Sequence, residues 1–163
     1  MKCYAYLDIE TTGLSRQFAD LTVIGIALVK GQVCCIEQLV GQDISAEKLL
    51  PLLEGVDEIY TYNGSRFDLP FIKAKLGLDL KSQFKHTDLM YHCWQKDLKG
   101  GLKAVENSLG IHRRLKGVDG RIAVWLWWEY VNNHDERALK TLLEYNGEDV
   151  LNLQLLRKKL GIR

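Results

Sequence analysis

Two carboxylates stand two residues apart near the start of this 163-residue sequence, in Asp8-Ile9-Glu10. Residues 2–9 form an apolar run that predicts a buried strand, and Gly13 permits the turn that ends it. Side chains two apart in a strand project to the same face, so we expect the two acids to lie side by side. Repulsion between the two carboxylates would raise the pKa of both acids. A hard divalent cation, which prefers oxygen ligands, would offset that repulsion. The alternative is that the two acids only mark a polar strand end.

A third acid, Asp68, follows a second predicted strand over 59–62 and stands before a helical segment with Pro70 in its first turn. This pattern is typical of a helix N-cap, which is the favoured interpretation of the segment taken alone. Strand ends in open α/β sheets are also where ligands bind. Asp68 would therefore project toward the first pair of acids if the two strands are adjacent.

A fourth acid lies in a long predicted helix over 135–160. Tyr145 and Asp149 are four residues apart and share a face of that helix, whereas Glu148 points elsewhere. Gly147 in mid-helix costs about 1 kcal/mol relative to alanine, which indicates either a close approach of another segment or a tolerated defect. Tyr145 is alternatively a core aromatic whose hydroxyl reaches the surface.

The hydrophobic pattern predicts the elements that must position these residues. The β-branched runs 21–29 and 32–40 form an antiparallel hairpin, so that three strands open the chain, and a fifth strand lies at 84–86. Ser45 caps a short helix that Pro51 limits. Helical periodicity covers five later segments: 69–76, 88–96, 102–109, 122–131 and 135–160. This order predicts one α/β domain over residues 1–163, a mixed sheet flanked by helices.

Three acidic motifs thus occur in a fixed order: Asp8-x-Glu10, Asn63-x-x-x-Phe67-Asp68 and Tyr145-x-x-x-Asp149. Together they resemble the exonuclease motifs of the DEDD superfamily, and the tyrosine form of the third motif resembles its DEDDy branch, which includes proofreading domains of DNA polymerases. Three segments are most similar to the YprB-like predicted exonucleases: 6–14, 62–68 and 86–89. The resemblance covers residues 4 to about 155, most loosely over 97–134. It implies a ribonuclease H-like mixed sheet of about five strands, the first three antiparallel.

The resemblance also implies an activity, that of a metal-dependent 3′–5′ exonuclease acting on the 3′ ends of single-stranded DNA or RNA. Two Mg²⁺ or Mn²⁺ ions would be held about 3.5–4 Å apart by Asp8, Glu10, Asp68 and Asp149. Tyr145 would position the attacking water through its hydroxyl, because a phenol is a poor base at neutral pH. These five residues are the expected catalytic set.

Candidate substrate contacts lie near the motifs and in one basic cluster. A formal net charge of +1 provides no global attraction for a polyanion, so phosphate contacts must come from local clusters. The resemblance implies that the turn after the first motif lies against the terminal nucleotide and that two residues shape the second motif. The expected contacts are Thr11, Thr12, Leu14, Asn63, Phe67, Arg113 and Arg114.

Several residues have more than one interpretation. Asp88 could support the site from behind, replace a ligand or cap the next helix, and the cap is favoured. His86 is expected to be packed, because Mg²⁺ prefers oxygen donors. Trp125 and Trp128 share a helical face and are predicted to pack in the core, which leaves Trp127 as the one tryptophan of the three that could be exposed.

The composition excludes disordered, collagen-like and disulfide-packed proteins. The sequence is 47% hydrophobic and 26% charged, which is ordinary for a globular domain. Its four cysteines lack C-x-x-C spacing and are predicted to be reduced structural thiols, and no signal peptide or membrane span is evident, so a cytoplasmic location is expected. Two other functions remain as alternatives. One is a catalytically silent nucleic-acid-binding module of the same fold. The other is a phosphotransferase, which is disfavoured because phosphotransferases of the kind considered need two such domains around a nucleotide.

Overall fold

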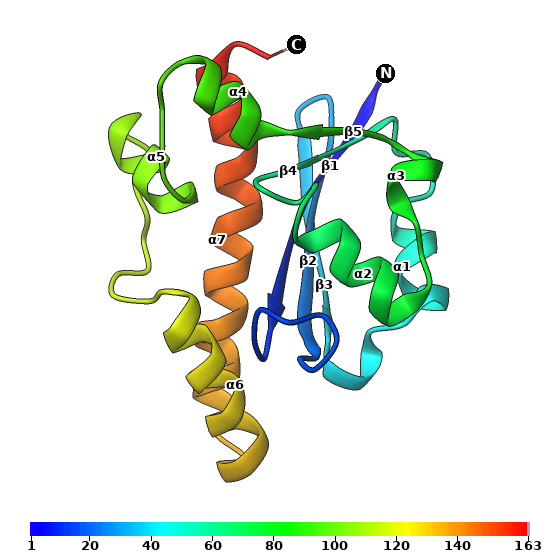
Figure 1. Ribbon diagram of the computed structural model, residues 1–163, viewed down its shortest axis with the longest axis vertical. Coiled ribbons are helices and arrows are strands. Elements are labelled where there is room, and N and C mark those ends of the chain that lie inside the picture. The colour runs from blue at the N-terminus through cyan, green and yellow to red at the C-terminus, as the bar shows by residue number, and fades with distance from the viewer. Residues whose placement is uncertain (163) are drawn as a thin grey trace.

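The computed structural model describes residues 1–162, and within them a five-stranded mixed sheet lies between two layers of helices (Figure 1). The strands are β1 (Cys3–Thr11), β2 (Leu21–Lys30), β3 (Val33–Val40), β4 (Glu58–Thr61) and β5 (Lys85–Asp88). The helices are α1 (Ala46–Leu52), α2 (Asp68–Leu76), α3 (Leu80–Gln83), α4 (Leu89–Gln95), α5 (Leu102–Ser108), α6 (Gly120–Asn133) and α7 (Glu136–Leu160), with a 3₁₀ turn η1 (Gly41–Asp43) after β3.

The sheet has the order β3-β2-β1-β4-β5, so β1 is its central strand. β1 pairs antiparallel with β2, which pairs antiparallel with β3, whereas β4 runs parallel to both β1 and β5. The predicted mixed sheet with three antiparallel opening strands is therefore confirmed. Because β1 and β4 are parallel neighbours, their carboxyl ends lie at the same edge of the sheet.

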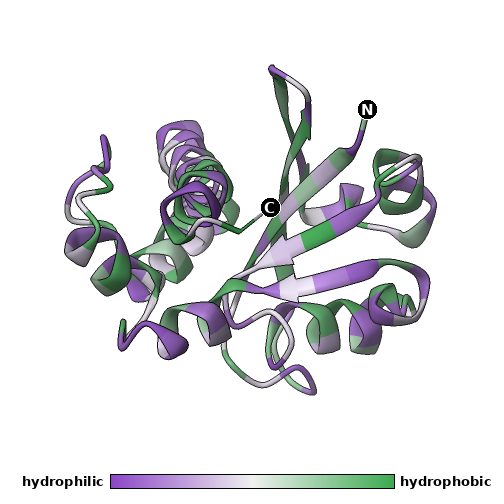
Figure 2. Ribbon diagram, turned by 90° about the horizontal axis from the view of Figure 1, so that it is seen from above, coloured by the Kyte–Doolittle hydropathy of each residue, from purple (hydrophilic) through white to green (hydrophobic). Residues whose placement is uncertain are grey.

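Alternation along β1 separates two hydrophobic cores. Ala5, Leu7 and Ile9 pack against α1, α2 and α3 on one face of the sheet. Tyr6 packs against α4, α5 and α7 on the other face, which Asp8 and Glu10 share by the two-residue period of a strand. Seen from above in Figure 2, helices lie on both sides of the sheet. The face that carries the two acids is thus the one that α7 covers.

The helices begin and end within a few residues of the predicted limits. Ser45 caps α1 by accepting a hydrogen bond from the backbone N–H of Lys48 at 3.2 Å, and Pro51 lies just before the last residue of that helix. Neither α3 nor η1 was predicted, because elements of four and three residues are too short to show a periodic pattern.

The prediction for the tryptophans of α6 is wrong. Trp125 and Trp128 are 57% and 43% exposed, whereas Trp127 is half-buried and packs against the core between α6 and α7. The buried positions of α6 are Ala123 and Leu126. These two residues repeat at the same spacing of three as the exposed tryptophans, so periodicity alone did not decide which stripe faces α7.

The cysteine prediction is confirmed in part. All four cysteines are free thiols, and Cys93 is buried as a structural thiol would be. Cys34 and Cys35 are instead exposed on the edge strand β3, so they have no packing role. Over residues 1–162, no helix combines the length and the apolar character that crossing a membrane requires.

Candidate active site

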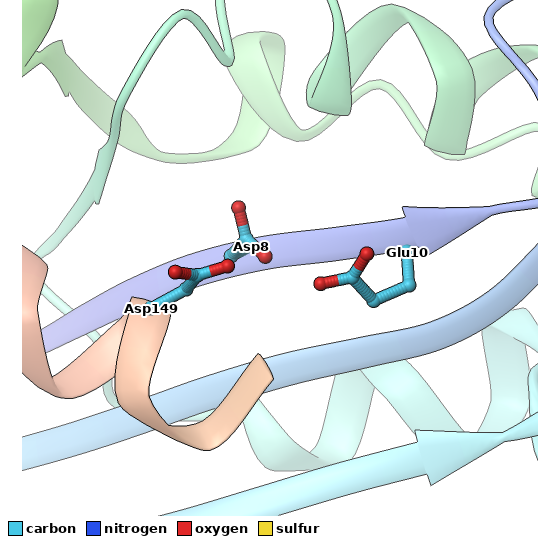
Figure 3. Close-up of side chains that lie close together, drawn as sticks. All are labelled: Asp8, Glu10 and Asp149. Carbon is cyan, nitrogen blue, oxygen red and sulfur yellow. The ribbon is translucent and has the colours of Figure 1, made fainter. Parts of the chain in front are cut away.

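Three carboxylates meet where α7 crosses β1. Asp8 and Glu10 project from β1 toward Asp149 on α7, and one oxygen of each lies within 4.8 Å of the other two (Figure 3). Glu10 and Asp149 are only 9% and 5% exposed. The predicted neighbours in β1 therefore do lie side by side, and α7 adds an acid from a part of the chain about 140 residues away.

Asp68 lies next to these three acids, and we call the four together the carboxylate cluster. The Asp68 side chain is buried, and its Oδ1 accepts a hydrogen bond at 3.0 Å from the backbone N–H of Ile9, which separates the two acids of β1. The N-cap of α2 is Phe67, and Asp68 is the first residue of the helix. The N-cap interpretation of Asp68 is therefore wrong, because its carboxylate bonds to β1 instead of the start of its own helix.

The acids of the cluster resist ionisation. Burial raises the pKa of Asp8 and of Glu10 well above their ordinary values, and the charge of Asp149 raises both further. Burial raises the pKa of Asp68 to about 7, although the N–H of Ile9 stabilises its charged form. The pKa of Asp149 is also raised by burial, against the lowering effect of Arg113. Additional positive charge is needed before all four can ionise together.

This donor set fits a hard divalent cation. Carboxylate oxygens are the ligands that Mg²⁺ prefers, and Mn²⁺ uses the same kind. Ligands on opposite sides of Mg²⁺, each at about 2.1 Å, are about 4.2 Å apart. The oxygens of Asp8, Glu10 and Asp149, within 4.8 Å of one another, are therefore near enough for the three side chains to rotate toward a shared ion.

Asn146 ties α7 to the strands beneath it. Its Nδ2 donates to Asp8 Oδ2 at 3.2 Å, and its Oδ1 accepts from Gln38 Nε2 at 2.9 Å. Asp8, Gly25 and Gln38 are partners across β1, β2 and β3, so the amide lies over Gly25. A Cβ at Gly25 would be 1.9 Å from Asn146 Oδ1. The close approach suggested by Gly147 is not found there, where the nearest atom to an added Cβ is 3.9 Å away.

We expect Gly25→Ala to lower the free energy of unfolding by about 2–4 kcal/mol, because the methyl group displaces Asn146 and its hydrogen bonds. Urea denaturation measures this change. Gly120→Ala is the matched control, since an added Cβ there meets nothing within 4 Å, and its effect should be within about 0.5 kcal/mol. Equal effects of the two substitutions would contradict the contact.

Asp88 anchors the loop that follows β4. It caps α4 by accepting from the N–H of Met90 at 3.1 Å, which confirms the cap interpretation. The same carboxylate accepts from the N–H groups of Asn63 and Ser65, at 2.8 and 3.0 Å, and from Ser65 Oγ at 2.6 Å. Four donors occupy this carboxylate, so Asp88 fixes the loop of the second motif and is not available as a metal ligand.

Two further residues of this region are part of the packing. Phe67 belongs to the core beneath α2, with its ring centre 5.5 Å from that of Phe71. His86 Nε2 lies 2.8 Å from Thr61 Oγ1, and burial lowers its pKa. The expectation of a packed histidine is confirmed.

The turn after β1 reaches the surface. Leu14 is 87% exposed at its tip. The two threonines stabilise the turn itself: Thr11 Oγ1 donates to the carbonyl of Gly13 at 2.6 Å, and Thr12 Oγ1 accepts from the N–H of Asp20 at 2.9 Å. Among these predicted contacts, Leu14 is therefore the one whose side chain projects freely from the turn.

Arg113 brings a positive charge to the cluster. Its Nε and Nη2 donate to the carboxylate of Glu106 at 2.6 and 2.9 Å, and Nη2 also donates to Asp149 Oδ1. Asn152 Nδ2 donates to the same Glu106 at 3.1 Å. This predicted substrate contact is thus paired with two acids of its own chain.

Tyr145 lies one helical turn before Asp149 and is buried at the edge of the cluster. Lys103 Nζ donates to its hydroxyl and stands 4.4 Å from the centre of its ring. Burial and then the nearby acids, Asp149 first, raise the pKa of Tyr145. The phenol is therefore protonated at neutral pH and can act as a hydrogen-bond donor.

The sequence did not indicate the contacts that three polar residues make in this region. Asn146 shares the inner face of α7 with Asp149, three residues on, and that spacing was a usable signal. Glu106 had none, because its partners come from other segments. Glu148 accepts from the backbone N–H groups of Arg114 and Leu115, so the acid that points away from the cluster holds the segment that carries Arg113. The Arg114 side chain is exposed.

Known proteins of the same fold were found by sequence and by structure. YprB, an uncharacterized protein of Bacillus subtilis (strain 168), is 28% identical over an alignment of length 163, which covers 91% of this chain and 39% of YprB. The family B DNA polymerase of the archaeon Pyrobaculum calidifontis matches 98% of this chain and 24% of its own, with 15% identity and a TM-score of 0.74. A structure titled the apo form of the nuclease matches 98% of this chain and 72% of its own, with 21% identity and a TM-score of 0.65.

The chain therefore spans well under half of YprB and about a quarter of the polymerase. The structural likenesses, all at low identity, concern the fold, and the resemblance to YprB-like proteins is confirmed. The model of one family, described as the RNase H superfamily, matches residues 5–161. Since that match covers nearly the whole sequence and the ribonuclease H-like sheet is present, this protein belongs to the RNase H superfamily.

Proposed function

We propose that this protein is a metal-dependent 3′–5′ exonuclease that hydrolyses phosphodiester bonds at the 3′ ends of single-stranded DNA or RNA. The observation that carries the proposal is the convergence of oxygens from Asp8, Glu10 and Asp149 within 4.8 Å, with Asp68 beside them. The order of the three motifs and the match to the RNase H superfamily support a nuclease site. The polarity and the DEDDy assignment rest on the resemblance of the motifs.

The carboxylate cluster would hold two Mg²⁺ or Mn²⁺ ions. Bound there, such ions supply the Lewis acidity that activates water and stabilises the leaving oxygen of a phosphodiester. The chain holds the acids in place for this role: Asn146 donates to Asp8, and the N–H of Ile9 donates to Asp68. Hydrogen bonds of this kind fix the orientation of a ligand and its affinity for the metal.

The remaining parts of the site would bind and orient the reactants. The protonated hydroxyl of Tyr145 would orient the attacking water without removing its proton. The exposed Leu14 would contact the terminal nucleotide, and the exposed Arg114 would contact phosphates, which makes binding weaker as salt rises. Arg113 would contact phosphate from within the site.

We expect Tyr145→Phe to lower kcat about 10- to 100-fold with little change in KM, because the ring is kept and only the orienting hydroxyl is lost. Initial rates on a labelled oligonucleotide with Mn²⁺ measure both constants. Tyr130→Phe, which changes a tyrosine on α6 outside the site, should retain the original kcat. A Tyr145→Phe protein with full activity would remove the hydroxyl from the mechanism.

The activity itself is tested with purified protein, Mn²⁺ and single-stranded DNA and RNA oligonucleotides labelled at either end. A 3′–5′ exonuclease releases a labelled mononucleotide at once from the 3′-labelled strand and produces a ladder from the 5′-labelled strand. Circular single-stranded DNA, which has no end, should survive. Asp8→Ala and Asp149→Ala should degrade neither strand, and equal degradation by all three proteins would refute the assignment. Retention of the oligonucleotides without cleavage would identify a silent binding module.

A further inference from the structure

Arg113 places a positive charge against Asp149, an acid of the carboxylate cluster that is expected to bind a cation. Its side chain is almost completely buried, as are those of its two partners, Glu106 and Asp149. Glu106 is held by a two-point contact and by Asn152, so that pair is complete without Asp149. The contact to Asp149 is a second, separate use of Nη2. It places a positive charge on the one acid that α7 contributes to the cluster.

The segment that carries Arg113 is fixed to α7 independently of this contact. Glu148 accepts from two successive backbone N–H groups, those of Arg114 and Leu115, at 2.5 and 3.1 Å. Ile111 is buried against the core on the other side of Arg113. Because Nη2 also donates to Glu106, Asp149 can turn away from Nη2 toward a cation while the backbone and the Glu106 contact of Arg113 stay in place.

The present arrangement does not satisfy the guanidinium completely. Nη1 of Arg113 is buried and has no hydrogen-bond partner within residues 1–162. A buried donor without a partner is rare in folded proteins and is costly. An arrangement in which another acceptor, such as a phosphate oxygen, reaches this nitrogen would satisfy it better.

Arg113 and a divalent cation would repel each other strongly if both contacted the carboxylate of Asp149, because two positive charges would then lie close together. We propose that Arg113 is the internal counter-ion of the metal-free site, which contacts Asp149 until a divalent cation binds and then keeps only Glu106. The proposal rests on the proposed function, because it requires that the carboxylate cluster holds a metal. By thermodynamic linkage, an anionic substrate that engages Arg113 in place of Asp149 promotes metal binding. Loading of the site with metal is thereby coupled to the presence of substrate.

Calorimetric titration of the full chain with Mn²⁺ alone, without substrate, tests this coupling. Arg113→Gln should bind Mn²⁺ about tenfold more tightly than the unchanged protein, a coupling of ordinary size. Arg121→Gln removes the same charge from an exposed arginine of α6, and its affinity should stay within about twofold. An Arg113→Gln protein that binds Mn²⁺ no more tightly than Arg121→Gln would overturn the counter-ion role.

A second measurement needs no variant. In a crystal of the unchanged protein soaked with Mn²⁺, Arg113 should keep its contact to Glu106 and lack the one to Asp149. A metal-loaded site in which the Asp149 contact persists would overturn the proposal. Failure of the proposed function looks different: the unchanged protein would bind no Mn²⁺, or Asp8→Asn would leave Mn²⁺ binding intact. Binding that Asp8→Asn abolishes and Arg113→Gln leaves unchanged would refute the counter-ion role alone.

Discussion

Asp8→Asn is expected to slow phosphodiester hydrolysis about 1,000-fold or more while the protein remains folded. Asp8 is central to the carboxylate cluster. Asparagine has the same shape as aspartate but carries an uncharged amide, so the substitution removes the charge. Metal ions contribute several kcal/mol to the stabilisation of such transition states, and each 1.4 kcal/mol is a factor of ten in rate. The new amide can still hydrogen-bond to Asn146, so the packing of α7 on β1 should survive.

The rate is measured with Mn²⁺ and a 5′-labelled oligonucleotide, and circular dichroism reports the fold. Asp20→Asn is a suitable control, because Asp20 is an exposed acid in the turn after β1. Its rate should be close to that of the unchanged protein. If Asp8→Asn degraded the strand as fast as Asp20→Asn, the cluster would not be the catalytic centre.

The second large effect concerns stability without metal, which should fall as pH rises from 5 to 8. Burial raises the pKa of Asp68 to about 7 in the folded protein, from an ordinary value of 3.8. The folded state therefore binds more protons than the unfolded state between these values, and stability decreases with pH. At 1.36 kcal/mol for each pH unit, Asp68 alone accounts for about 3 kcal/mol over this interval. Asp8, Glu10 and Asp149, whose pKa values are also raised, act in the same direction.

Urea denaturation in a chelating buffer at pH 5 and pH 8 measures this difference, and Mn²⁺ should remove most of it at pH 8. An ion at 100 times its Kd adds about 2.7 kcal/mol to the free energy of unfolding. Asp68→Asn should reduce the pH dependence because it keeps the shape of the side chain but cannot ionise. A metal-free protein with the same stability at both pH values would show that the cluster is neutralised in some other way.

The sequence was sufficient to predict the sheet and the acids that the sheet and α7 bring together. Asp8 and Glu10 follow from the two-residue period of a strand, and Tyr145 and Asp149 from the four-residue period of a helix. Both periods are properties of the backbone, so they can be read from spacing alone. The meeting of β1 with α7 required the order of the motifs and their resemblance to a known family.

Side-chain contacts between distant segments were beyond reach of the same reasoning. Asp68 had the local pattern of a helix cap, yet its partner is the N–H of Ile9, 59 residues earlier. Arg113 was predicted to contact substrate because it lies in a basic cluster, and that stays a prediction; its contacts to Glu106 and Asp149 were not predicted. The alternative partners differ only in three-dimensional position, which composition and spacing do not encode. The prediction for the tryptophans of α6 was wrong for a related reason. Two rows of side chains on that helix repeat with the same period, so the period did not show which row is buried.

Asp149 follows Asp68 by 81 residues in the sequence, and this separation has a consequence for biosynthesis. During translation, β1 and the start of α2, which carry the first three acids, emerge long before α7, the helix that packs on β1. A ribosome-bound chain that ends before Asp149 lacks one of the four carboxylates, whatever its sheet has become. The carboxylate cluster is therefore completed only after α7 has been synthesised.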